Sequence, residues 1–531
     1  MSVQFDLRPE LTAIFDEQLL MDKICSSSYF KISIKRYVHS YGNKSIVFKQ
    51  GLSYLNMKKI IEAFSRNAAT DGFECIIAPT VSKYIADREM YLDARSKLGV
   101  EIKRQEERLH VEFDSFRETV NSLLIRQLRE RQMWDAFFML SMKKSCNFSV
   151  PGSGKTSSVF GMYSFLDHAK LIKRIVIVCP KNAFGPWIDE YHACFGEEKQ
   201  LRLFSIQDET LKSKQQRKSA LLYESGAANM FLFNYESIKS YQEELSSIIN
   251  AETLLVFDEV HKIKRIDGEY AKAAIHIARR AGFTIAMTGT PIPNSYADIY
   301  NVLHVLYPED YEDYFGFQVS TLKAPKQYEI DRINNKLQPF FCRTTKAQLN
   351  VPAPNSDAIL PVAATSEEIK LFRILLKKYK KNKLLLMLRI LQLESDPLQL
   401  LEAINLADFR YILDDDVDVD AIDYADYSND IITLINNCGR TSKTQQCIST
   451  ISGLVMQNKP VVLWCIFVNT IHALAKRLTA IGIKVKCVYG EVALSERQKL
   501  LREFKEGKYQ VLRRDLSRLF SPAEYKCPTL L

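Results

Sequence analysis

Ser149-Val150-Pro151-Gly152-Ser153-Gly154-Lys155-Thr156 is the stretch of sequence that decides the fold, because it has the form of a loop that wraps a phosphate chain. Its two glycines let the backbone approach closely, so that successive N–H groups can point at phosphate oxygens. We expect Lys155 to reach the β- and γ-phosphates of a nucleotide and the Thr156 hydroxyl to ligate Mg²⁺. Ser149 stands where the strict pattern has glycine, so a plain glycine-rich turn is the alternative interpretation.

An acidic pair follows the phosphate loop further along the chain. The apolar run that begins at residue 253 ends in Asp258 and Glu259, and His261 comes two positions later. In an enzyme with a phosphate loop, an aspartate at a strand end holds Mg²⁺ through its water shell, and the next glutamate can orient and deprotonate the attacking water. Alone, these residues could form an acidic surface turn. Their place after a phosphate loop favours the catalytic interpretation.

Short apolar runs surround both motifs and predict the fold class. Runs that are apolar without alternation, and that end in polar turns, are typical of strands buried on both faces of a parallel sheet. In the first half of the chain they lie at 174–180, 229–235, 253–259 and 283–289. A second set lies at 459–468 and 484–490, around a helical segment at 469–478. The pattern predicts an α/β protein with two parallel-sheet lobes, joined by a helical stretch (366–412) and an acidic segment (414–426).

The N-terminal part of the chain differs from these lobes. Strand-like segments at 30–38, 44–48 and 73–79 surround a helical segment at 56–64, and long helices are expected from 81 to 140. We therefore expect an α+β accessory domain over residues 1–127 and a first lobe with the nucleotide site over 128–352. A helical and acidic connector is expected over 353–440, and a second lobe over 441–531.

Composition narrows the class of protein without naming a function. The 531 residues are 47% hydrophobic and 25% charged, as in globular proteins, and the net charge of +9 permits a polyanionic partner without requiring one. The longest strongly apolar run has eight residues, from Val461 to Val468, whereas a membrane helix needs about 20. Eleven scattered cysteines without a C-x-x-C pair suit a reducing compartment. We expect a cytoplasmic protein without membrane contact.

Taken in order, the motifs from Leu128 to Gln510 resemble those of the superfamily-2 helicases, and within them the Swi/Snf-type DNA translocases. The matching segments of the first lobe are 128–132, the phosphate loop, 178–181 with Trp187 and Glu190, 234–236, the D-E-x-H box with its basic extension 262–264, 288–291 with Asn294, and 337–346 closed by Val351-Pro352. In the second lobe they are Thr441-Ser-Lys443, the strand from Val461, Tyr489-Gly490, and Ser495 and Arg497 before Phe504.

The resemblance implies two RecA-like lobes, ATP and Mg²⁺ as cofactors, and translocation on DNA. Double-stranded DNA is expected, with little sequence specificity. The implied ATP-binding residues are Gln132 and the run from Pro151 through Gly152, Ser153, Gly154 and Lys155 to Thr156. The implied catalytic residues are Lys155, Asp258 and Glu259, with Thr156 and Asp258 on the metal. Coupling of hydrolysis to movement is implied for His261, Thr288, Gly289 and Thr290, and nucleic-acid contact for Lys181, Asn234 and Tyr235.

The resemblance breaks after Leu512, where the family continues into two further motifs. The chain instead reads RRDLSRLFSPAEYKCPTLL, and Arg513, Arg514 and Arg518 do not follow the family's arginine pattern. We therefore expect a truncated or frameshifted second lobe that turns ATP over slowly. The form NFSVPGSGKT is similar to prokaryotic relatives, and the accessory domain is expected to select a substrate or a protein partner. Two alternatives remain open: a nucleic-acid-binding scaffold without turnover, and an NTPase that acts on a protein partner.

Overall fold

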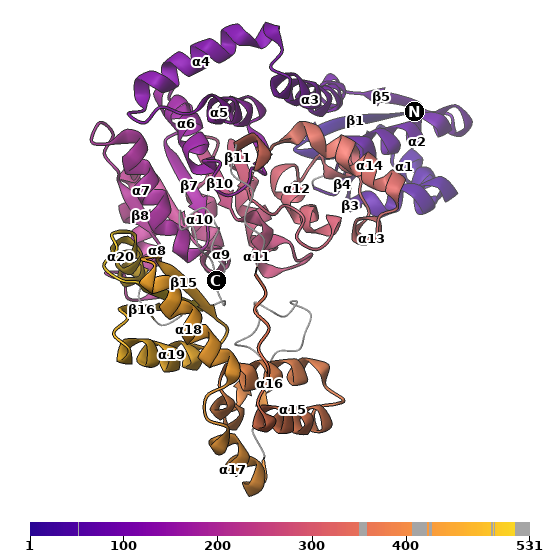
Figure 1. Cartoon of the computed structure of the whole chain (residues 1–531). Coiled ribbons are helices and arrows are strands. Elements are labelled where there is room, and N and C mark those ends of the chain that lie inside the picture. Colours follow the sequence, from indigo (N-terminus) through magenta and orange to yellow (C-terminus); the bar gives the residue numbers. More distant parts are fainter. Residues whose placement is uncertain are drawn as a thin grey trace. The chain divides into compact units, whose positions relative to one another are not determined.

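The computed structural model describes residues 1–50, 52–349, 358–405, 422–423, 427–489, 492 and 494–515. The chain divides into two compact units, Met1–Val351 and Pro352–Leu531 (Figure 1). Each unit has its own sheets and hydrophobic core. Within the described ranges, no helix combines the length and the apolar character that a bilayer crossing requires.

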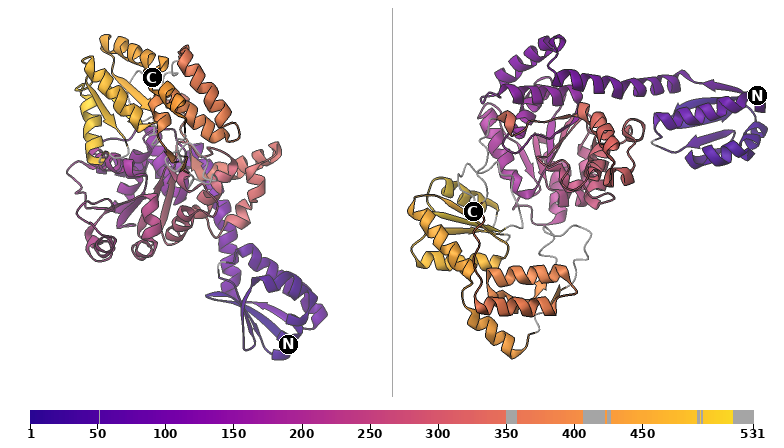
Figure 2. Two further views of the ribbon diagram at one scale, coloured as in Figure 1. Left: turned by 90° about the horizontal axis from the view of Figure 1, so that it is seen from below. Right: turned by 45° about the vertical axis from the view of Figure 1, so that its right-hand side comes forward.

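A seven-stranded parallel sheet with the order β12-β6-β11-β10-β7-β9-β8 forms the centre of the first lobe. Its strands are β6 (Lys144–Asn147), β7 (Arg174–Val178), β8 (Leu203–Ser205), β9 (Met230–Phe233), β10 (Thr253–Asp258), β11 (Phe283–Met287) and β12 (Phe341–Cys342). Every residue of β9 and β11 is buried, so both faces of the sheet are covered (Figure 2). The helices of this lobe are α5 (Glu130–Met142), α6 (Lys155–His168), α7 (Phe184–Phe195), α8 (Lys214–Ser219), α9 (Tyr235–Ser240), α10 (Gln242–Ile248), α11 (Glu269–Ala278), α12 (Tyr300–Leu306), α13 (Val319–Lys323) and α14 (Gln327–Leu337).

The α/β fold class is confirmed, and each of the four predicted strands of this sheet is present. Three further strands, β6, β8 and β12, were not predicted, and they have only four, three and two residues. Strand β6 reads KSCN, so it carries no apolar run although three of its residues are buried. Its position between β11 and β12 satisfies the backbone groups, and that pairing cannot be read from local hydrophobicity.

The N-terminal residues form a separate five-stranded sheet with the order β3-β4-β2-β1-β5. Its elements are β1 (Ser2–Arg8), β2 (Glu10–Phe15), α1 (Gln18–Ser26), β3 (Val38–Gly42), β4 (Ser45–Phe48), α2 (Tyr54–Asp71) and β5 (Glu74–Ile77). Phe64 of α2 lies at the centre of its core, edge-to-face against Phe5 with ring centroids 5.0 Å apart. The predicted helix at 56–64 and the strands near 44–48 and 73–79 are confirmed.

The strand predicted at 30–38 is wrong over most of its length. Residues Phe30–Ile34 form a π-helical turn (η1) and Lys35–Tyr37 a 3-10 turn (η2), and strand begins only at Val38. Phe30 and Ile34 are both buried, whereas Ile32 between them is 77% exposed. The two buried apolar residues, Phe30 and Ile34, are therefore four positions apart, which is helical spacing. The β-branched composition of the segment favoured a strand and hid this period.

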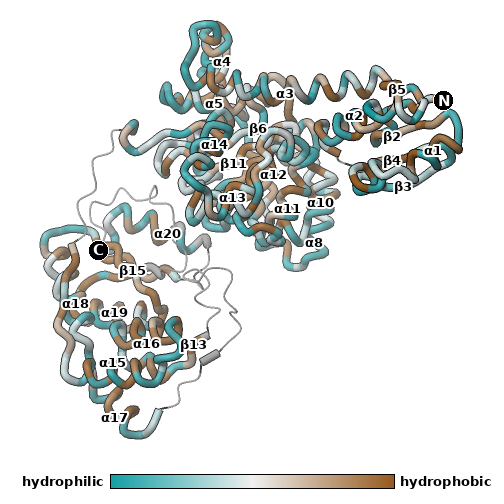
Figure 3. The backbone as a smooth tube through the Cα atoms, turned by 90° about the vertical axis from the view of Figure 1, so that its right-hand side faces the viewer, coloured by the Kyte–Doolittle hydropathy of each residue, from teal (hydrophilic) through white to brown (hydrophobic). Residues whose placement is uncertain are grey.

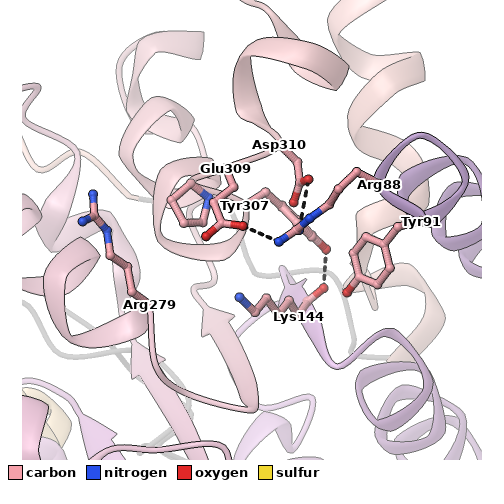
Figure 4. Close-up of a pocket in the computed structure, with 8 residues that line it drawn as sticks. Arg88, Tyr91, Lys144, Arg279, Tyr307, Glu309 and Asp310 are labelled. Carbon is pink, nitrogen blue, oxygen red and sulfur yellow. Dashed lines mark hydrogen bonds and ion pairs between the residues drawn. The ribbon is translucent and has the colours of Figure 1, made fainter. Parts of the chain in front are cut away.

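Helix α3 (Pro79–Lys103) leads from the N-terminal sheet to the first lobe, and α4 (His110–Leu123) follows it, as predicted for this part of the chain. Arg88 of α3 pairs with Glu309 and Asp310, and Lys103 donates to the Gln338 carbonyl at 2.7 Å. Arg88 also lines a cavity of about 190 Å³, with Lys144 and Arg279 on the facing side (Figure 4). Because Lys144 is the first residue of β6, this cavity lies at the amino-terminal edge of the sheet, away from the phosphate loop.

The second unit combines helices with a three-stranded parallel sheet of order β15-β17-β16. Its elements are α15 (Ser366–Lys378), α16 (Lys383–Ser395), η12 (Pro397–Leu401), β13 (Ile404–Asn405), β14 (Ile422–Asp423), α17 (Asn429–Cys438), α18 (Ser442–Met456), β15 (Val461–Cys465), α19 (Val468–Ala480), β16 (Val485–Val488), α20 (Leu494–Lys505) and β17 (Val511–Asp515). The buried Gln399 side chain donates to Thr470 Oγ1 at 2.6 Å, which joins the helical part to α19. The second parallel sheet is confirmed, and the helical stretch predicted over 366–412 is confirmed as far as Leu401, after which Ile404–Asn405 is strand. Residues 406–412 and most of the acidic segment 414–426 lie outside the described residues.

Replacing Arg88 by Met should loosen α3 from the first lobe. The substitution removes both ion pairs and leaves the carboxylate of Asp310, whose side chain is only 8% exposed, without its guanidinium partner. We expect amide hydrogen exchange in peptides covering Pro79–Lys103 to become roughly tenfold faster, measured by mass spectrometry.

The matched control is Arg66→Met, which removes an exposed ion pair with Glu62 within α2. Such a pair contributes only about 0.3–0.5 kcal/mol, so exchange in α3 should not change. Unchanged exchange in the Arg88 variant would contradict the assigned role of its ion pairs.

Candidate nucleotide site

The phosphate loop joins β6 to α6 and has the backbone conformation that its glycines predict. Gly152 and Gly154 have φ of 83° and 85°, in the left-handed region that favours glycine. A Cβ added at Gly154 would lie 2.0 Å from Nε2 of Gln132, so no side chain fits there without displacing that amide. The loop ends at Lys155, the first residue of α6, whose leading N–H groups have no acceptor within the helix.

Gln132 holds the phosphate loop from the preceding helix. Its Nε2 donates to the Ser153 carbonyl at 3.0 Å, and its Oε1 accepts the N–H of Arg129 at 2.9 Å. The side chain therefore bridges the start of α5 and the middle of the loop. Its contact with an adenine ring stays a prediction.

Ser149, which replaces the first glycine of the strict motif, is fully buried and hydrogen-bonded. Its Oγ accepts the N–H of Thr344 at 2.9 Å, and its carbonyl accepts Nζ of Lys155 at the same distance. The hydroxyl also lies 3.5 Å from Oδ2 of Asp135, whose pKa is raised to about 6 by burial. Serine is thus accommodated because its hydroxyl ties the loop to the segment after β12.

Asp258 ends β10 and is held by two aromatic side chains. Nε1 of Trp187 donates to its Oδ2 at 3.0 Å, and the Tyr235 hydroxyl donates to its backbone carbonyl at 2.8 Å. Its Oδ1 accepts the N–H of Glu259 at 2.9 Å. Trp187 is 1% exposed and packs edge-to-face on Phe160 of α6, so the indole is fixed in this orientation. Trp187 was predicted as part of a motif, but its hydrogen bond to Asp258 was not.

Glu259, His261 and Thr288 meet at the ends of β10 and β11. Thr288 Oγ1 donates to Glu259 Oε2 at 3.2 Å and lies 3.0 Å from Nδ1 of His261. The same oxygen accepts the N–H of Thr290 at 3.1 Å. Glu259 has φ of 50°, an uncommon conformation for a residue with a side chain. We call these three residues together with Asp258 the acidic corner.

Gly289 brings the acidic corner against the phosphate loop. A Cβ at this position would lie 2.7 Å from Cδ of Pro151, which is closer than such atoms approach. The absence of a side chain therefore lets the segment 288–290 pack directly on the loop. Gly289 and Pro151 are predicted site residues, and the structure brings them into contact.

Burial and neighbouring charges set the protonation of the site. Burial and the adjacent Glu259 raise the pKa of Asp258 to about 6, against the opposing effect of Lys155. Burial alone would raise the pKa of Glu259, but its hydrogen bond to His261 and the charges of His261 and Lys155 outweigh it, so the pKa lies below its ordinary value. Burial lowers the pKa of Lys155, which the two carboxylates partly offset. At neutral pH Glu259 is therefore ionised.

The predicted nucleic-acid contacts lie at the same edge of the sheet. Lys181 is exposed in a 3-10 turn (η4, Lys181–Ala183) after β7. Asn234 and Tyr235 follow β9 and are 2% and 3% exposed, with the Asn234 side chain engaged by Glu236 and Gln207. Contact of these three residues with nucleic acid stays a prediction.

Several residues named in the sequence analysis have no described side chain. Val351, Pro352, Gly490 and Arg518 lie outside the described residues, and of Arg513 and Arg514 only the backbone in β17 is described. In the second unit, the buried Arg497 donates to the carbonyls of Val492 and Tyr489 at 2.7 and 2.9 Å.

Comparison with known proteins gives the family. Residues 137–408 match the model of the SNF2-related domain, which is just over half of the chain. The chromodomain-helicase-DNA-binding protein 3 homolog of Caenorhabditis elegans is 23% identical over 246 residues, 44% of this chain and 13% of that protein. The ISWI chromatin-remodeling complex ATPase ISW1 of Saccharomyces cerevisiae is 22% identical over 267 residues, 48% of this chain and 22% of that protein.

The chain thus spans less than a quarter of the length of either relative. Among solved structures, the SWI2/SNF2 ATPase core of Sulfolobus solfataricus in complex with dsDNA has a TM-score of 0.37 and 17% sequence identity. That comparison covers 74% of this chain and 79% of that chain. On the match of residues 137–408, the chain belongs to the SNF2-related family.

Proposed function

We propose that the chain hydrolyses ATP with Mg²⁺ at the carboxyl edge of its seven-stranded sheet, and that hydrolysis drives movement along double-stranded DNA. The observation that carries the proposal is the acidic corner, in which an ionised carboxylate is fixed beside a phosphate loop. The SNF2-related family and the named relatives, one of which is an ATPase of a chromatin-remodeling complex, support the same activity.

The residues present suit a nucleotide with Mg²⁺. The phosphate loop turns sharply through Gly152 and Gly154, both in the left-handed region, and Lys155 supplies a cation at its end. A threonine hydroxyl and a carboxylate, from Thr156 and Asp258, are the oxygen donors that Mg²⁺ prefers. Bound there, Mg²⁺ would neutralise charge on the β- and γ-phosphate oxygens.

Within this site the residues have different roles. Lys155 would bind phosphate charge, and Asp258, which Trp187 orients, would hold Mg²⁺. Glu259, with its lowered pKa, accepts a proton from water and is kept in place by Thr288 and His261. Because Thr288 also binds the N–H of Thr290, a change at the carboxylate reaches the segment 288–290, which is our proposed coupling element.

Movement along DNA requires contacts that do not depend on sequence. Phosphate contacts fix a protein on a duplex without reading bases, so we propose little sequence preference. Lys181 is the exposed candidate for such a contact at the carboxyl edge of the sheet. The dsDNA of the Sulfolobus complex is a partner of that protein, and for this chain the same partner is our proposal.

Glu259→Gln should abolish turnover while nucleotide binding persists. The amide cannot accept the proton of the attacking water, so DNA-stimulated phosphate release should fall by roughly 10²–10⁴-fold, with MgADP affinity by calorimetry within about twofold. Glu269→Gln is the matched control, because this carboxylate lies on the surface of α11 and is 58% exposed. Wild-type turnover in the Glu259 variant would exclude it as the base.

DNA dependence separates the proposal from its alternatives. We expect duplex DNA to stimulate phosphate release, and ATP to drive displacement of a third strand from a triplex. If DNA stimulates hydrolysis but the third strand is not displaced, translocation is contradicted while DNA-dependent ATP hydrolysis is not. DNA binding without turnover would favour the scaffold, and turnover indifferent to DNA would favour an NTPase that acts on another partner.

Affinity for MgADP should fall in acid because Asp258 must be ionised to hold the cation. Its pKa of about 6 means that protonation competes with the metal below that pH. Between about pH 7.5 and pH 5.5 we expect a roughly fourfold loss of affinity by calorimetry. Proton release on binding should make the measured enthalpy depend on the ionisation enthalpy of the buffer. Asp258→Asn corrects for titration of the nucleotide and should lack this loss. An equal pH dependence in both proteins would show that Asp258 does not titrate in this range.

A further inference from the structure

The N-terminal domain contains a long segment without any acidic residue. From Lys23 to Ile61 the sequence has no aspartate or glutamate. The same 39 positions hold eight lysines and arginines: Lys23, Lys31, Lys35, Arg36, Lys44, Lys49, Lys58 and Lys59. The acids of the first 77 residues come before the segment, from Asp6 to Asp22, or after it, from Glu62 to Glu74. The charges of one small domain are therefore separated along the chain.

The fold gathers this segment at one end of the five-stranded sheet. It forms η1, η2, the edge strand β3, its neighbour β4 and the first turns of α2 (Figure 3). The N–H of Lys49 donates to the Tyr37 carbonyl at 2.8 Å, which places the end of β4 beside η2. The Tyr37 hydroxyl donates to Asn56 Oδ1 at 3.2 Å, which places η2 beside α2. The basic residues of η2, of the end of β4 and of the first turns of α2 are thus brought close together.

Five of these side chains are exposed and have no acidic partner in the described part of the domain. They are Lys31, Lys35, Arg36, Lys49 and Lys59, which we call the basic surface. At its border, Lys23 pairs with Asp71 at 3.6 Å, and Lys44 donates to the Asp16 carbonyl at 2.7 Å. Elsewhere in the domain the exposed Arg8 and Arg66 both have carboxylate partners. In the part of residues 1–77 that the structure describes, these five exposed cations therefore form the main group without a carboxylate partner, with Lys44 beside it.

Protection of an exposed sheet edge does not account for this distribution. Lysines on an edge strand prevent pairing with another strand, but one or two suffice and they belong on that strand. Here β3 itself carries no lysine or arginine, and the cations lie on the flanking turns and on α2. Clustered lysines and arginines on one face are instead the electrostatic mark of a surface that binds phosphates.

We propose that the basic surface binds the phosphate backbone of duplex DNA, as a contact separate from the candidate nucleotide site. Single strands are bound mainly by stacking on several exposed rings. Near the basic surface Tyr41 is the aromatic side chain that is exposed by more than half, at 52%. Charge spread over three elements of a packed domain therefore fits a duplex better. The proposal does not depend on ATP hydrolysis, so its failure and that of the proposed function can be told apart.

Charge reversal in the full chain tests the proposal directly. We would measure binding of Lys35→Glu/Arg36→Glu/Lys49→Glu to a fluorescent duplex of about 30 base pairs by anisotropy over a range of KCl, without nucleotide. The control is Lys83→Glu/Lys97→Glu/Arg104→Glu, which changes the net charge equally at exposed positions in and just after α3.

Loss of three phosphate contacts should lower the slope of log affinity against log salt by about 2–3 and weaken binding by roughly tenfold or more at 0.1 M salt. The control should bind within about twofold of the wild type, and DNA-independent phosphate release should be the same in all three proteins. A neutral triple with glutamine at Lys35, Arg36 and Lys49 guards against misfolding and should show an intermediate slope.

Three results would overturn the proposal. The first is a slope of log affinity against log salt that is unchanged in both the glutamate and the glutamine triple variants. The second is an equal loss of DNA affinity in the control variant, which would show that net charge alone is responsible. The third is tighter binding of a single strand of the same length through the same three residues, which would contradict the assignment to duplex DNA.

Discussion

The hydroxyl of Thr288 is the interaction on which the candidate site depends, because it is shared by Glu259, His261 and the N–H of Thr290. The sharing follows from the pairing of two strands. In the parallel register Asp258 of β10 lies opposite Met287 of β11, so the residues that follow each strand emerge side by side. A shift of one residue in this register would separate the carboxylate from the hydroxyl.

The same edge of the sheet accounts for the remaining features of the site. The phosphate loop follows β6, which pairs with the other side of β11, and Gly289 lets the two segments touch at Pro151. Trp187 reaches Asp258 from α7, so the helix after β7 also contributes. Adjacent parallel strands thus bring together loops that are far apart in the sequence, which is how ligand sites arise in such sheets.

This edge could be predicted from the sequence because the acidic pair at 258–259 and the segment 288–290 each follow a buried apolar run, and a parallel sheet places such ends together. The hydrogen bond from Trp187 to Asp258 could not be predicted, because the two residues are 71 positions apart and no sequence pattern indicates which acceptor a tryptophan N–H will bind. Strand β6, whose four residues are mostly polar, was also not predicted, and 30–37 was wrongly predicted as strand. Strand β6 is decided by pairing with β11 and β12, which local hydrophobicity does not show. In 30–37 the helical spacing of Phe30 and Ile34 was present but was hidden by the β-branched composition of the segment.

Ser149 shows how a departure from a motif can be compatible with its conformation. The left-handed conformations of the loop are supplied by Gly152 and Gly154, so the turn does not require a glycine at position 149. The Ser149 hydroxyl instead accepts the N–H of Thr344. This hydrogen bond joins the phosphate loop to the segment after β12, which is near the C-terminal end of the first unit in sequence. The strict motif has glycine at position 149, where the backbone conformation is what matters. In this chain the side chain at that position makes a hydrogen bond.

The central claim is that Thr288 acts through Glu259, and a double-mutant cycle on phosphate release tests it most directly. Thr288→Val should slow DNA-stimulated turnover by roughly 10–100-fold in the wild type, yet by less than about twofold when Glu259 is already Gln. Thr284→Val in β11, the strand that precedes Thr288, is the control, since this buried hydroxyl has no hydrogen-bond partner among the described residues and its loss should leave turnover unchanged. Effects of Thr288→Val and Glu259→Gln that multiply would contradict the account, because they would place the two residues in independent roles.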